Sequence, residues 1–325
     1  MSVADRGLSL SDSQQAAVRD LHRRRGAYNL VGLGFAALWA ASAAFTLHVT
    51  GAAKLLGFVT SGVALHALGI LMHEGVHGAF FASPVLNRWV GFACSAPVLL
   101  AGSAYRAYHL PHHRHVRGAE DPDEFENVTR RPGVLKLLLV LWLMMGSPFY
   151  LVYIPIVGYR RGTQEARRAI LTEYLLIACL VAAAVSLVPP RALVDVWLAP
   201  FCVALLFGQV RGFTEHIFTA GDAPVHCART ITSNRVTAFL MLNLNYHLDH
   251  HLYPGVPWYN LPRLHAVLRD ELRRVGAPVS RSYCAFLWEV AKMFPRKVPG
   301  PVQGPESGYY LHYMPVLPAI PGSAG

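Results

Sequence analysis

Histidine is the residue whose number and spacing point most directly to chemistry. The chain of 325 residues contains 16 histidines, and many of them fall in three short clusters. Residues 73–77 carry the spacing H-x-x-x-H, whereas residues 109–113 and 247–251 both carry H-x-x-H-H. Positions three and four apart lie on one face of a helix. Each cluster can therefore direct its imidazoles toward a common point.

Clusters of imidazole of this kind predict a metal site, because imidazole binds iron, copper and zinc. One zinc takes four ligands in a structural site and three in a catalytic one. Eight clustered histidines exceed that number and imply two metals. They are His73, His77, His109, His112, His113, His247, His250 and His251. A ninth candidate is His216, which follows Glu215 and stands alone in the sequence.

Other residues near the clusters are expected to support the ligands. Glu74, Glu215 and Asp249 are placed to accept the second ring N–H of a ligating histidine and so fix its tautomer. His115 lies on a different helix face from the other histidines of its cluster, and we expect a supporting or structural role. Pro111 should occupy the first helical turn, where a missing N–H is harmless.

Three histidines outside the clusters are expected to have other roles. His226 and His265 have no histidine partner at helical spacing, which favours surface or packing roles. His66 lies seven residues before the first cluster, inside a long apolar stretch, and reads as a core histidine.

The composition predicts a membrane protein. Apolar residues make up 53% of the chain and charged residues 15%, against roughly 25% charged in soluble proteins. Four apolar stretches, residues 28–49, 52–72, 170–188 and 193–210, are each long enough to cross a bilayer. Short connections join the first two and the last two, which predicts two helical hairpins. A soluble enzyme and a disordered protein are both excluded by this composition.

Two further apolar segments are interrupted. Residues 89–104 contain Pro97 and Gly102, and residues 134–159 are broken at 146–148 and again at Pro155. A single crossing by the second segment would place the basic residues that flank it on opposite sides, against the positive-inside rule. We therefore expect both segments to be re-entrant or interfacial.

With four spans, the charge distribution sets the expected topology. Only Lys54 and Arg191 fall on the outer side, and the other 27 of the 29 basic residues face the cytoplasm, together with both termini and the histidine clusters. The formal charge of +10 then reflects orientation in the membrane, so no nucleic-acid partner is expected.

The chain divides into three parts by composition. Residues 1–27 form a polar, cytoplasmic N-terminal segment, residues 28–294 the membrane domain, and residues 295–325 a tail with seven prolines. That many prolines exclude a helix in the tail. The five cysteines are scattered and suggest neither a disulfide framework nor a thiolate metal site.

Together these motifs resemble the membrane-bound fatty acid desaturase family, within the larger group of histidine-box desaturases, hydroxylases and ketolases. The resemblance extends from about His73 to His265. It rests on the order of the three clusters, on Glu215-His216 and on the motif from Asn245 to Pro262. It implies a diiron site whose ligands are His73, His77, His109, His112, His113, His216, His247, His250 and His251.

The implied fold is an all-α integral membrane protein. Four transmembrane helices in two hairpins, with re-entrant or interfacial helices, would support a cytoplasmic cap that holds the diiron site. In this family an asparagine one turn before the isolated histidine can complete the site through water. Gly212 occupies that position here, which leaves the tenth ligand open.

The implied activity is O2-dependent removal of hydrogen from unactivated C–H bonds of a lipid, most simply desaturation of a fatty acyl chain. No catalytic group beyond the diiron centre is required of the protein. The sequence contains no haem, flavin, nicotinamide or iron–sulfur motif, so an external electron donor of ferredoxin or cytochrome type is expected. The carrier of the acyl chain stays open among CoA, acyl carrier protein and phospholipid.

Two other functions are compatible with parts of the sequence. A carotenoid ketolase or hydroxylase is favoured by residues 121–123 and 253–258, whereas Glu215-His216 is more typical of acyl desaturases. An intramembrane zinc protease could use His73, Glu74 and His77 as an H-E-x-x-H site. The protease would bind one zinc and would leave the second and third clusters without a function.

Overall fold

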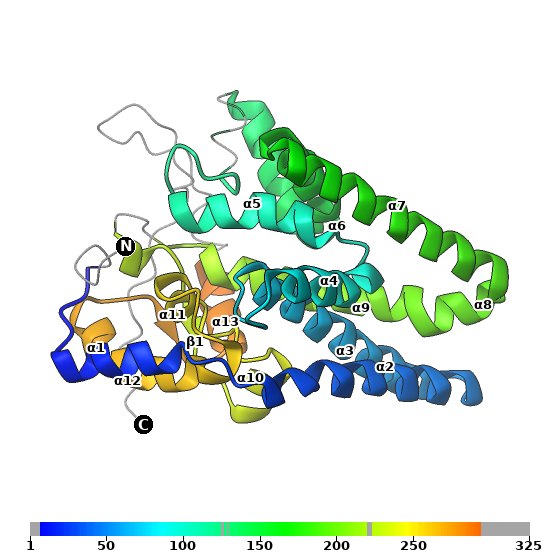
Figure 1. Ribbon diagram of the computed structural model, residues 1–325, viewed down its shortest axis with the longest axis horizontal. Coiled ribbons are helices and arrows are strands. Elements are labelled where there is room, and N and C mark those ends of the chain that lie inside the picture. Colours follow the sequence, from blue (N-terminus) through cyan, green and yellow to red (C-terminus); the bar gives the residue numbers. More distant parts are fainter. Residues whose placement is uncertain (1–6, 125–126, 128, 130, 220–222, 294–325) are drawn as a thin grey trace. The chain divides into compact units, whose positions relative to one another are not determined.

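The computed structural model describes residues 7–124, 127, 129, 131–219 and 223–293, and the chain is mostly helical (Figure 1). The proline-rich tail that the sequence sets apart, residues 295–325, lies outside the described residues. Two compact units are present. Unit 1 comprises Met1–Arg23, Pro111–Met144 and Arg211–Gly325, and unit 2 comprises Arg24–Leu110 and Met145–Val210.

Helices dominate unit 2, and three of them continue along the chain into unit 1. The helices are α2 (Val31–His48), α3 (Ala53–Val76), α4 (Pro84–Ser95), α5 (Gly102–His115), α6 (Pro132–Arg161), α7 (Gln164–Leu187), α8 (Pro190–Leu193) and α9 (Ala199–His216). The continuing helices are α5, α6 and α9. Short 3-10 turns at Gly26–Leu30 and Ala96–Val98, and one π-helical turn at Val194–Leu198, link these helices.

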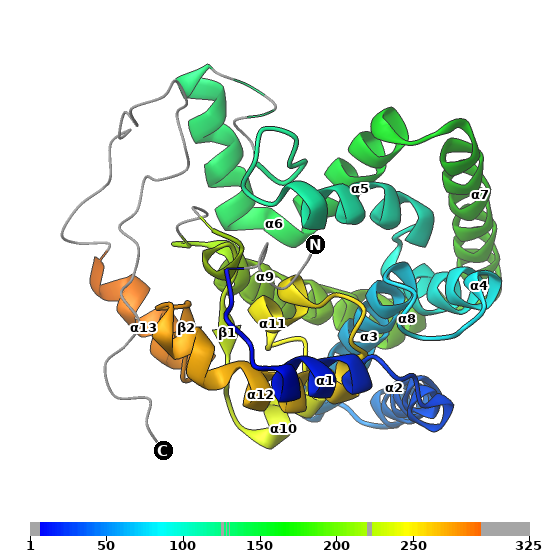
Figure 2. The same cartoon turned by 60° about the vertical axis from the view of Figure 1, so that its left-hand side comes forward.

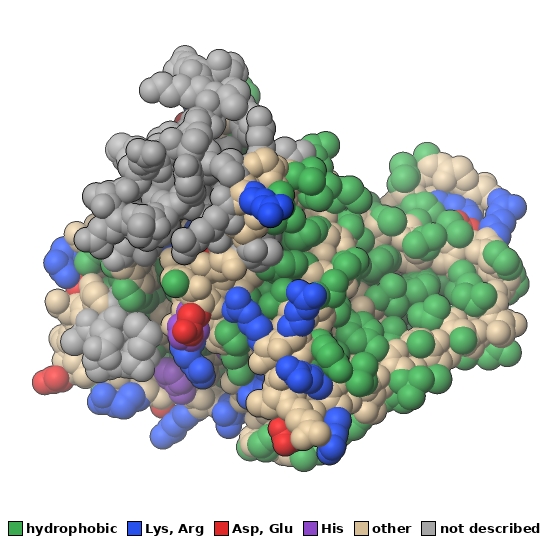
Figure 3. Space-filling view, turned by 90° about the horizontal axis from the view of Figure 1, so that it is seen from above, with side chains coloured by type: hydrophobic (Ala, Val, Ile, Leu, Met, Phe, Trp, Pro, Cys, Tyr) green, Lys and Arg blue, Asp and Glu red, His purple; other side chains and the backbone are tan. Residues whose placement is uncertain are grey.

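The four apolar stretches expected to cross a membrane are helices in the structure. Among the described residues, the segments Gly26–His48, Ala53–Val76, Gln164–Leu187 and Pro190–His216 are long and apolar enough to do so. A fifth span results only if the bent pair of α4 and α5 is counted as one. Apolar side chains cover much of the face toward α7 and α8 in Figure 3. Such exposed apolar surface is stable in lipid, so this is a membrane protein.

The interrupted segments bend at the places their sequence predicts, with one exception. The helix Pro84–Val98 and α5 are bent by 103° at the break before Gly102. In α6 the one non-helical residue is Met145 (φ −139°, ψ 28°), directly before Gly146. The expected second break at Pro155 is wrong, because α6 continues through it to Arg161. Neighbouring helices can satisfy the carbonyl that a proline frees in a membrane helix.

Small residues bring the long helices of unit 2 close together. Figure 1 shows α2 and α3 side by side. A Cβ added at Gly62 of α3 would lie 2.6 Å from the Val203 side chain of α9. Leu65, Phe201 and Ala204 form a buried cluster beside this contact. Small residues at helix interfaces allow such close packing within a membrane.

Unit 1 contains shorter helices and one pair of strands. They are α1 (Asp12–Leu21), α10 (Arg235–Leu240), α11 (His247–Leu252), α12 (Leu261–Arg274), α13 (Tyr283–Met293), β1 (Thr230–Ile231) and β2 (Val279–Ser280). The strands are parallel, with Thr230 opposite Val279 and Ile231 opposite Ser280.

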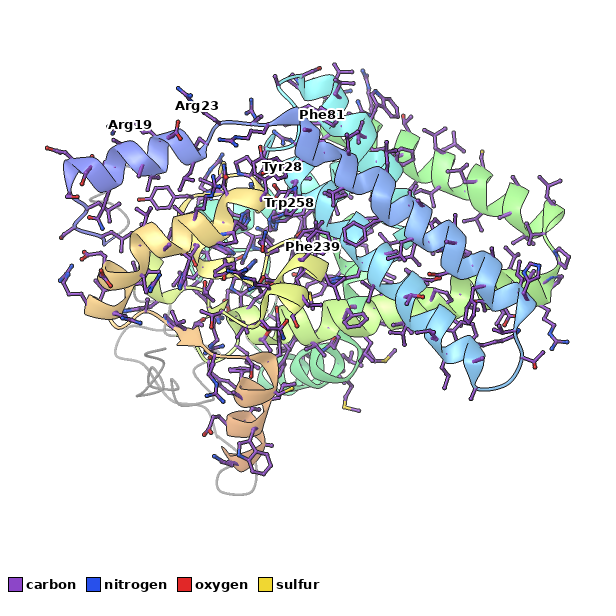
Figure 4. All side chains as sticks on the ribbon, turned by 90° about the horizontal axis from the view of Figure 1, so that it is seen from below. Arg19, Arg23, Tyr28, Phe81, Phe239 and Trp258 are labelled. Atoms are coloured by element: carbon purple, nitrogen blue, oxygen red, sulfur yellow. The ribbon has the colours of Figure 1, made fainter. Side chains whose placement is uncertain are left out.

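The N-terminal polar segment contains a helix that packs against α12 (Figure 2). Ser11 and Gln14 form a capping box at the start of α1. The Ser9 N–H donates to the Glu271 carboxylate, and the Gln14 side-chain amide donates to the Val267 carbonyl at 3.1 Å. Arg19 and Arg23 lie on the side of α1 away from α12 (Figure 4).

Candidate metal centre

Unit 2 brings together three of the expected ligands. His73 lies in the last turn of α3, His77 caps the C-terminus of that helix, and His109 lies in α5. The Nε2 atoms of His77 and His109 are 3.0 Å apart. The ring centroid of His73 is 4.7 Å from the centroids of both other rings. Tyr105 stacks on His109 at 4.7 Å. These three imidazoles could ligate one metal ion.

A buried carboxylate holds the start of the helix that carries His109. Glu173, fully buried in α7, accepts from the Ser103 backbone N–H at 2.8 Å and from the Ser103 hydroxyl at 2.5 Å. It also accepts from Arg88 Nε at 3.1 Å. A negative charge at a helix N-terminus is stabilised by the unpaired N–H groups there. Glu173 thus sets the position of α5.

The proline in the second cluster does not occupy the expected place. Pro111 lies near the C-terminal end of α5, which begins nine residues earlier at Gly102. The expectation of a first-turn proline is wrong because α5 begins well before the cluster. Its first turn is held by Glu173, which accepts from Ser103 and pairs with Arg88. The Pro111 ring costs one hydrogen bond inside the helix, and α5 ends four residues later.

Unit 1 brings together the other six expected ligands. His112, His216 and His251 have ligand atoms within 4.8 Å of one another. His247 Nε2 lies 3.0 Å from His216 Nε2 and 3.1 Å from His251 Nε2. His113 stacks on His251 with centroids 4.0 Å apart, and its Nε2 is 3.2 Å from His250 Nε2.

Hydrogen bonds at Nδ1 hold two of these rings in place. His112 Nδ1 donates to Asp121 Oδ1 at 2.9 Å, and His216 Nδ1 donates to the Cys227 carbonyl at 3.2 Å. With the proton on Nδ1, a neutral ring of this kind has its lone pair on Nε2. Burial, and after it the neighbouring imidazoles, lowers the pKa of His251 well below its ordinary value. Neutral, convergent nitrogen donors fit a bound transition metal.

Two arginines that the sequence analysis does not single out hold the end of α9, where His216 lies. The Arg229 guanidinium donates to the carbonyls of Thr214 at 2.9 Å, Ile217 at 2.7 Å and Phe218 at 3.2 Å. Arg117 donates to the His216 carbonyl and, at 2.6 Å, to the Glu124 carboxylate. Unpaired carbonyls at a helix C-terminus are satisfied in this way.

The expected supporting residues lie at different distances from the ligands. Glu215 Oε2 is 3.5 Å from His247 Nε2, and Glu74 Oε1 is 3.7 Å from His73 Nδ1. The Glu215 carboxylate also pairs with Arg211 at 3.0 Å.

The other two expected supporting residues, Asp249 and His115, have contacts with residues that are not proposed ligands. Asp249 accepts from the Thr230 hydroxyl at 2.7 Å and from His265 Nδ1 at 3.0 Å. His265 is therefore a partner of a site carboxylate. His115 lies 3.2 Å from Glu120, with 33% of its side chain exposed. His226 Nε2 donates to the Val275 carbonyl at 2.9 Å, which agrees with a packing role.

Asp121 is the clearest residue that sequence reasoning missed. It lies nine residues after His112 in an acidic run, and it is fully buried. Its carboxylate also accepts from the backbone N–H groups of Arg117 at 2.8 Å and Asp123 at 2.9 Å. The only signal in the sequence was an aspartate within reach of a histidine cluster through one loop.

Comparisons with known proteins identify the family of the chain. The family model for fatty acid desaturases matches residues 50–283. The chain is 24% identical over 243 residues to the human sphingolipid delta(4)-desaturase/C4-monooxygenase DES2, covering 71% of this chain and 70% of that protein.

A more distant relative acts on another lipid. The chain is 23% identical over 237 residues to the sn-1 oleoyl-lipid 12-desaturase of Synechocystis, covering 66% of this chain and 67% of that protein. With the family model matching more than half of its length, the chain belongs to the fatty acid desaturase family and is an oxidoreductase of lipid metabolism.

Proposed function

We propose that nine histidines of this chain hold two irons and that the enzyme desaturates the acyl chain of a membrane lipid with O2. The proposed ligands are His73, His77 and His109 of unit 2 and His112, His113, His216, His247, His250 and His251 of unit 1. The observation that carries the proposal is the convergence of these imidazoles, with the ligand atoms of His112, His216 and His251 within 4.8 Å of one another. Lone pairs that face one another repel unless a cation lies between them.

When bound, the two irons supply the activation of oxygen and the removal of hydrogen from an unactivated C–H bond. The protein supplies orientation and exclusion of water. Asp121 and the Cys227 carbonyl keep two imidazoles in the ligating tautomer. Phe213, Phe218 and Phe286 form a buried apolar cluster at the end of α9 and keep water from this side.

The substrate is proposed to be a lipid with a long acyl chain, because the relatives are named as desaturases of sphingolipids and of an oleoyl lipid. A carotenoid substrate is not favoured by these relatives. A zinc protease is not favoured either, since five histidines of the second and third clusters gather with His216 in unit 1. Electrons are proposed to come from a separate ferredoxin- or cytochrome-type donor.

The proposed topology has two membrane hairpins, with both termini and the metal centre in a cytoplasmic cap. The ion pair between Lys54 and Asp195 supports it, because it joins the start of α3 to the π-helical turn before α9. Both connections between the paired spans then lie at one end of unit 2, and most arginines lie elsewhere in the chain.

Metal analysis of the detergent-purified protein tests the proposal. We expect about two irons per chain, and less in His250→Ala. His226→Ala is the matched control, because His226 contacts the Val275 carbonyl and belongs to neither group. In an expressing host, the parent and the control should raise acyl unsaturation, and His250→Ala should not. One zinc per chain, unchanged in His250→Ala, would contradict the diiron proposal.

A further inference from the structure

A cavity in unit 2 adjoins the histidine group and is lined by three arginines. Its volume is about 470 Å³, which is within the usual range for small-molecule sites. Arg24, Arg88 and Arg106 lie on its wall, together with His77. Phe81, labelled in Figure 4 near the start of α2, also lines it. None of the described residues that line the cavity is acidic.

The positive charge of this cavity is only partly compensated within the described residues. Arg88 pairs with Glu173 through Nε alone, which leaves its two terminal nitrogens for another acceptor. Arg106 donates to the Val76 carbonyl, a neutral group, and Arg24 forms no ion pair with a described carboxylate. Three guanidinium charges against one carboxylate leave a net charge of +2. Guanidinium groups in this arrangement favour a phosphate, which they can bind through paired N–H donors.

The surroundings of the cavity indicate that its ligand arrives from the membrane. The cavity lies where the apolar span Ala53–Val76 ends, and Met72 and Val76 of that span line it. On the first turns of α4, Val85, Leu86 and Trp89 are 64%, 49% and 41% exposed, beside Arg88. Exposed apolar and aromatic side chains next to arginine are typical of the interface between lipid and water. A phospholipid meets these requirements, whereas a soluble phosphate carrier does not need the apolar rim.

We propose that this cavity binds the phosphate of a phospholipid, and that the acyl substrate is presented to the enzyme on an anionic phospholipid. The proposal rests on the proposed function for the identity of the reaction and names its substrate class. With the phosphate held by Arg24, Arg88 and Arg106, the acyl chain begins beside His77. Binding energy from the head group can then position a carbon that is far from it in the molecule.

Lipid binding to the full chain in detergent, measured by native mass spectrometry, tests this proposal. The probes are dioleoyl phosphatidylglycerol, a phosphate-free galactolipid with the same acyl chains, and inorganic phosphate. We expect phosphatidylglycerol to bind roughly tenfold more tightly than the galactolipid. The double variant Arg24→Gln/Arg106→Gln should lose that preference, and the exposed Arg191→Gln at the other end of unit 2 should keep it. Arg106→Lys should lose part of the preference, because lysine keeps the positive charge but lacks the paired N–H donors of the guanidinium group.

Each contrary outcome is distinct. Equal binding of the two lipids, or a preference that survives the double variant, would overturn the proposal. Displacement of the lipid by an equal concentration of inorganic phosphate would assign the cavity to a soluble anion and also overturn it. Arg24→Gln alone covers the case in which the double variant fails to fold, and it should still weaken phosphatidylglycerol binding severalfold. Iron content is measured on the same samples. A protein that binds iron but shows no lipid preference would reject the phospholipid proposal and leave the diiron proposal intact.

Discussion

At the scale of single residues, the hydrogen-bond partners of the histidines matter as much as the histidines. Asp121 accepts from His112 and from two backbone N–H groups, so it fixes both the ring and the loop behind it. The Cys227 carbonyl has the same role for His216. A neutral imidazole has one donor and one acceptor nitrogen, so the partner of one nitrogen decides what the other can bind.

Asp121→Asn tests this control of the tautomer. The amide keeps the shape of the side chain but removes the charge and can present N–H to the ring, so we expect iron affinity to fall about 10- to 100-fold. Iron content after dialysis against graded chelator measures the change. Glu120→Gln is the control, since the Glu120 side chain is 76% exposed and lies 3.2 Å from His115, which is not a proposed ligand. Equal iron retention in the two variants would reject the role of Asp121.

Arg229→Met tests the support of His216 from the end of α9. Burial, and after it the charge of Arg117, lowers the pKa of Arg229 to about 9, so the group stays charged at neutral pH. Methionine would leave three carbonyls without their donor, and we expect a loss of at least about 3 kcal/mol of stability. Thermal unfolding in detergent measures it. Arg263→Met, an exposed change on α12, should leave the midpoint unaltered.

At the scale of elements, a carboxylate within α7 sets the position of the histidine-bearing helix α5. Glu173→Ala removes the acceptor for the Ser103 N–H, the Ser103 hydroxyl and Arg88. We expect a loss of about 1.5–3 kcal/mol, because hydrogen bonds to a buried charged group are the stronger ones. Glu165→Ala, at the exposed start of the same helix, is the control. A comparable fall in the unfolding midpoint of both variants would contradict this role.

The contact between α1 and α12 should depend on pH. Hydrogen bonds from Arg274, with one from the Ser9 N–H, lower the pKa of Glu271 from 4.5 to about 2. A carboxyl with a lower pKa in the folded state contributes stability that is complete above about pH 4.5 and is lost as the pH falls toward 2. Hydrogen exchange of the α1 amides should therefore quicken over that interval.

Glu271→Gln separates this effect from general acid unfolding. The variant should show faster exchange in α1 already at neutral pH and little further change in the acid range. Glu289→Gln, which alters a more exposed ion pair on α13, should behave as the parent. Protection of α1 that is equal in parent and Glu271→Gln at pH 7 would show that the carboxylate does not hold this helix.

At the scale of the whole molecule, the distribution of basic residues predicts how the chain lies in the membrane. In sealed vesicles of known orientation, a membrane-impermeant maleimide should label Arg191→Cys from the outer side and Arg160→Cys from the cytoplasmic side. The reason is that a few basic residues near the ends of spans decide their orientation. Mass analysis of the labelled peptides distinguishes these sites from the native cysteines. Labelling of both variants from one side would contradict the four-span topology.

The sequence by itself determined the membrane character, the four apolar helices and the histidines worth considering. These properties follow from local composition and from spacing, because a span needs about twenty apolar residues and a ligand pair needs helical periodicity. The breaks at Gly102 and Gly146 were predictable for the same reason. The continuation of α6 through Pro155 was not, since a local rule takes no account of neighbouring helices.

Only the tertiary structure decided which groups meet. Asp121 was one acidic residue among several, and Arg229 carried no motif, until folding placed them against His112 and the end of α9. Likewise, the sequence shows Glu173 only as an acidic residue on an apolar helix, and the structure shows that it accepts from Ser103. The sequence indicates no partner for His265, and the structure places it against Asp249. Contacts between residues far apart in the chain depend on packing, which spacing along the sequence does not encode.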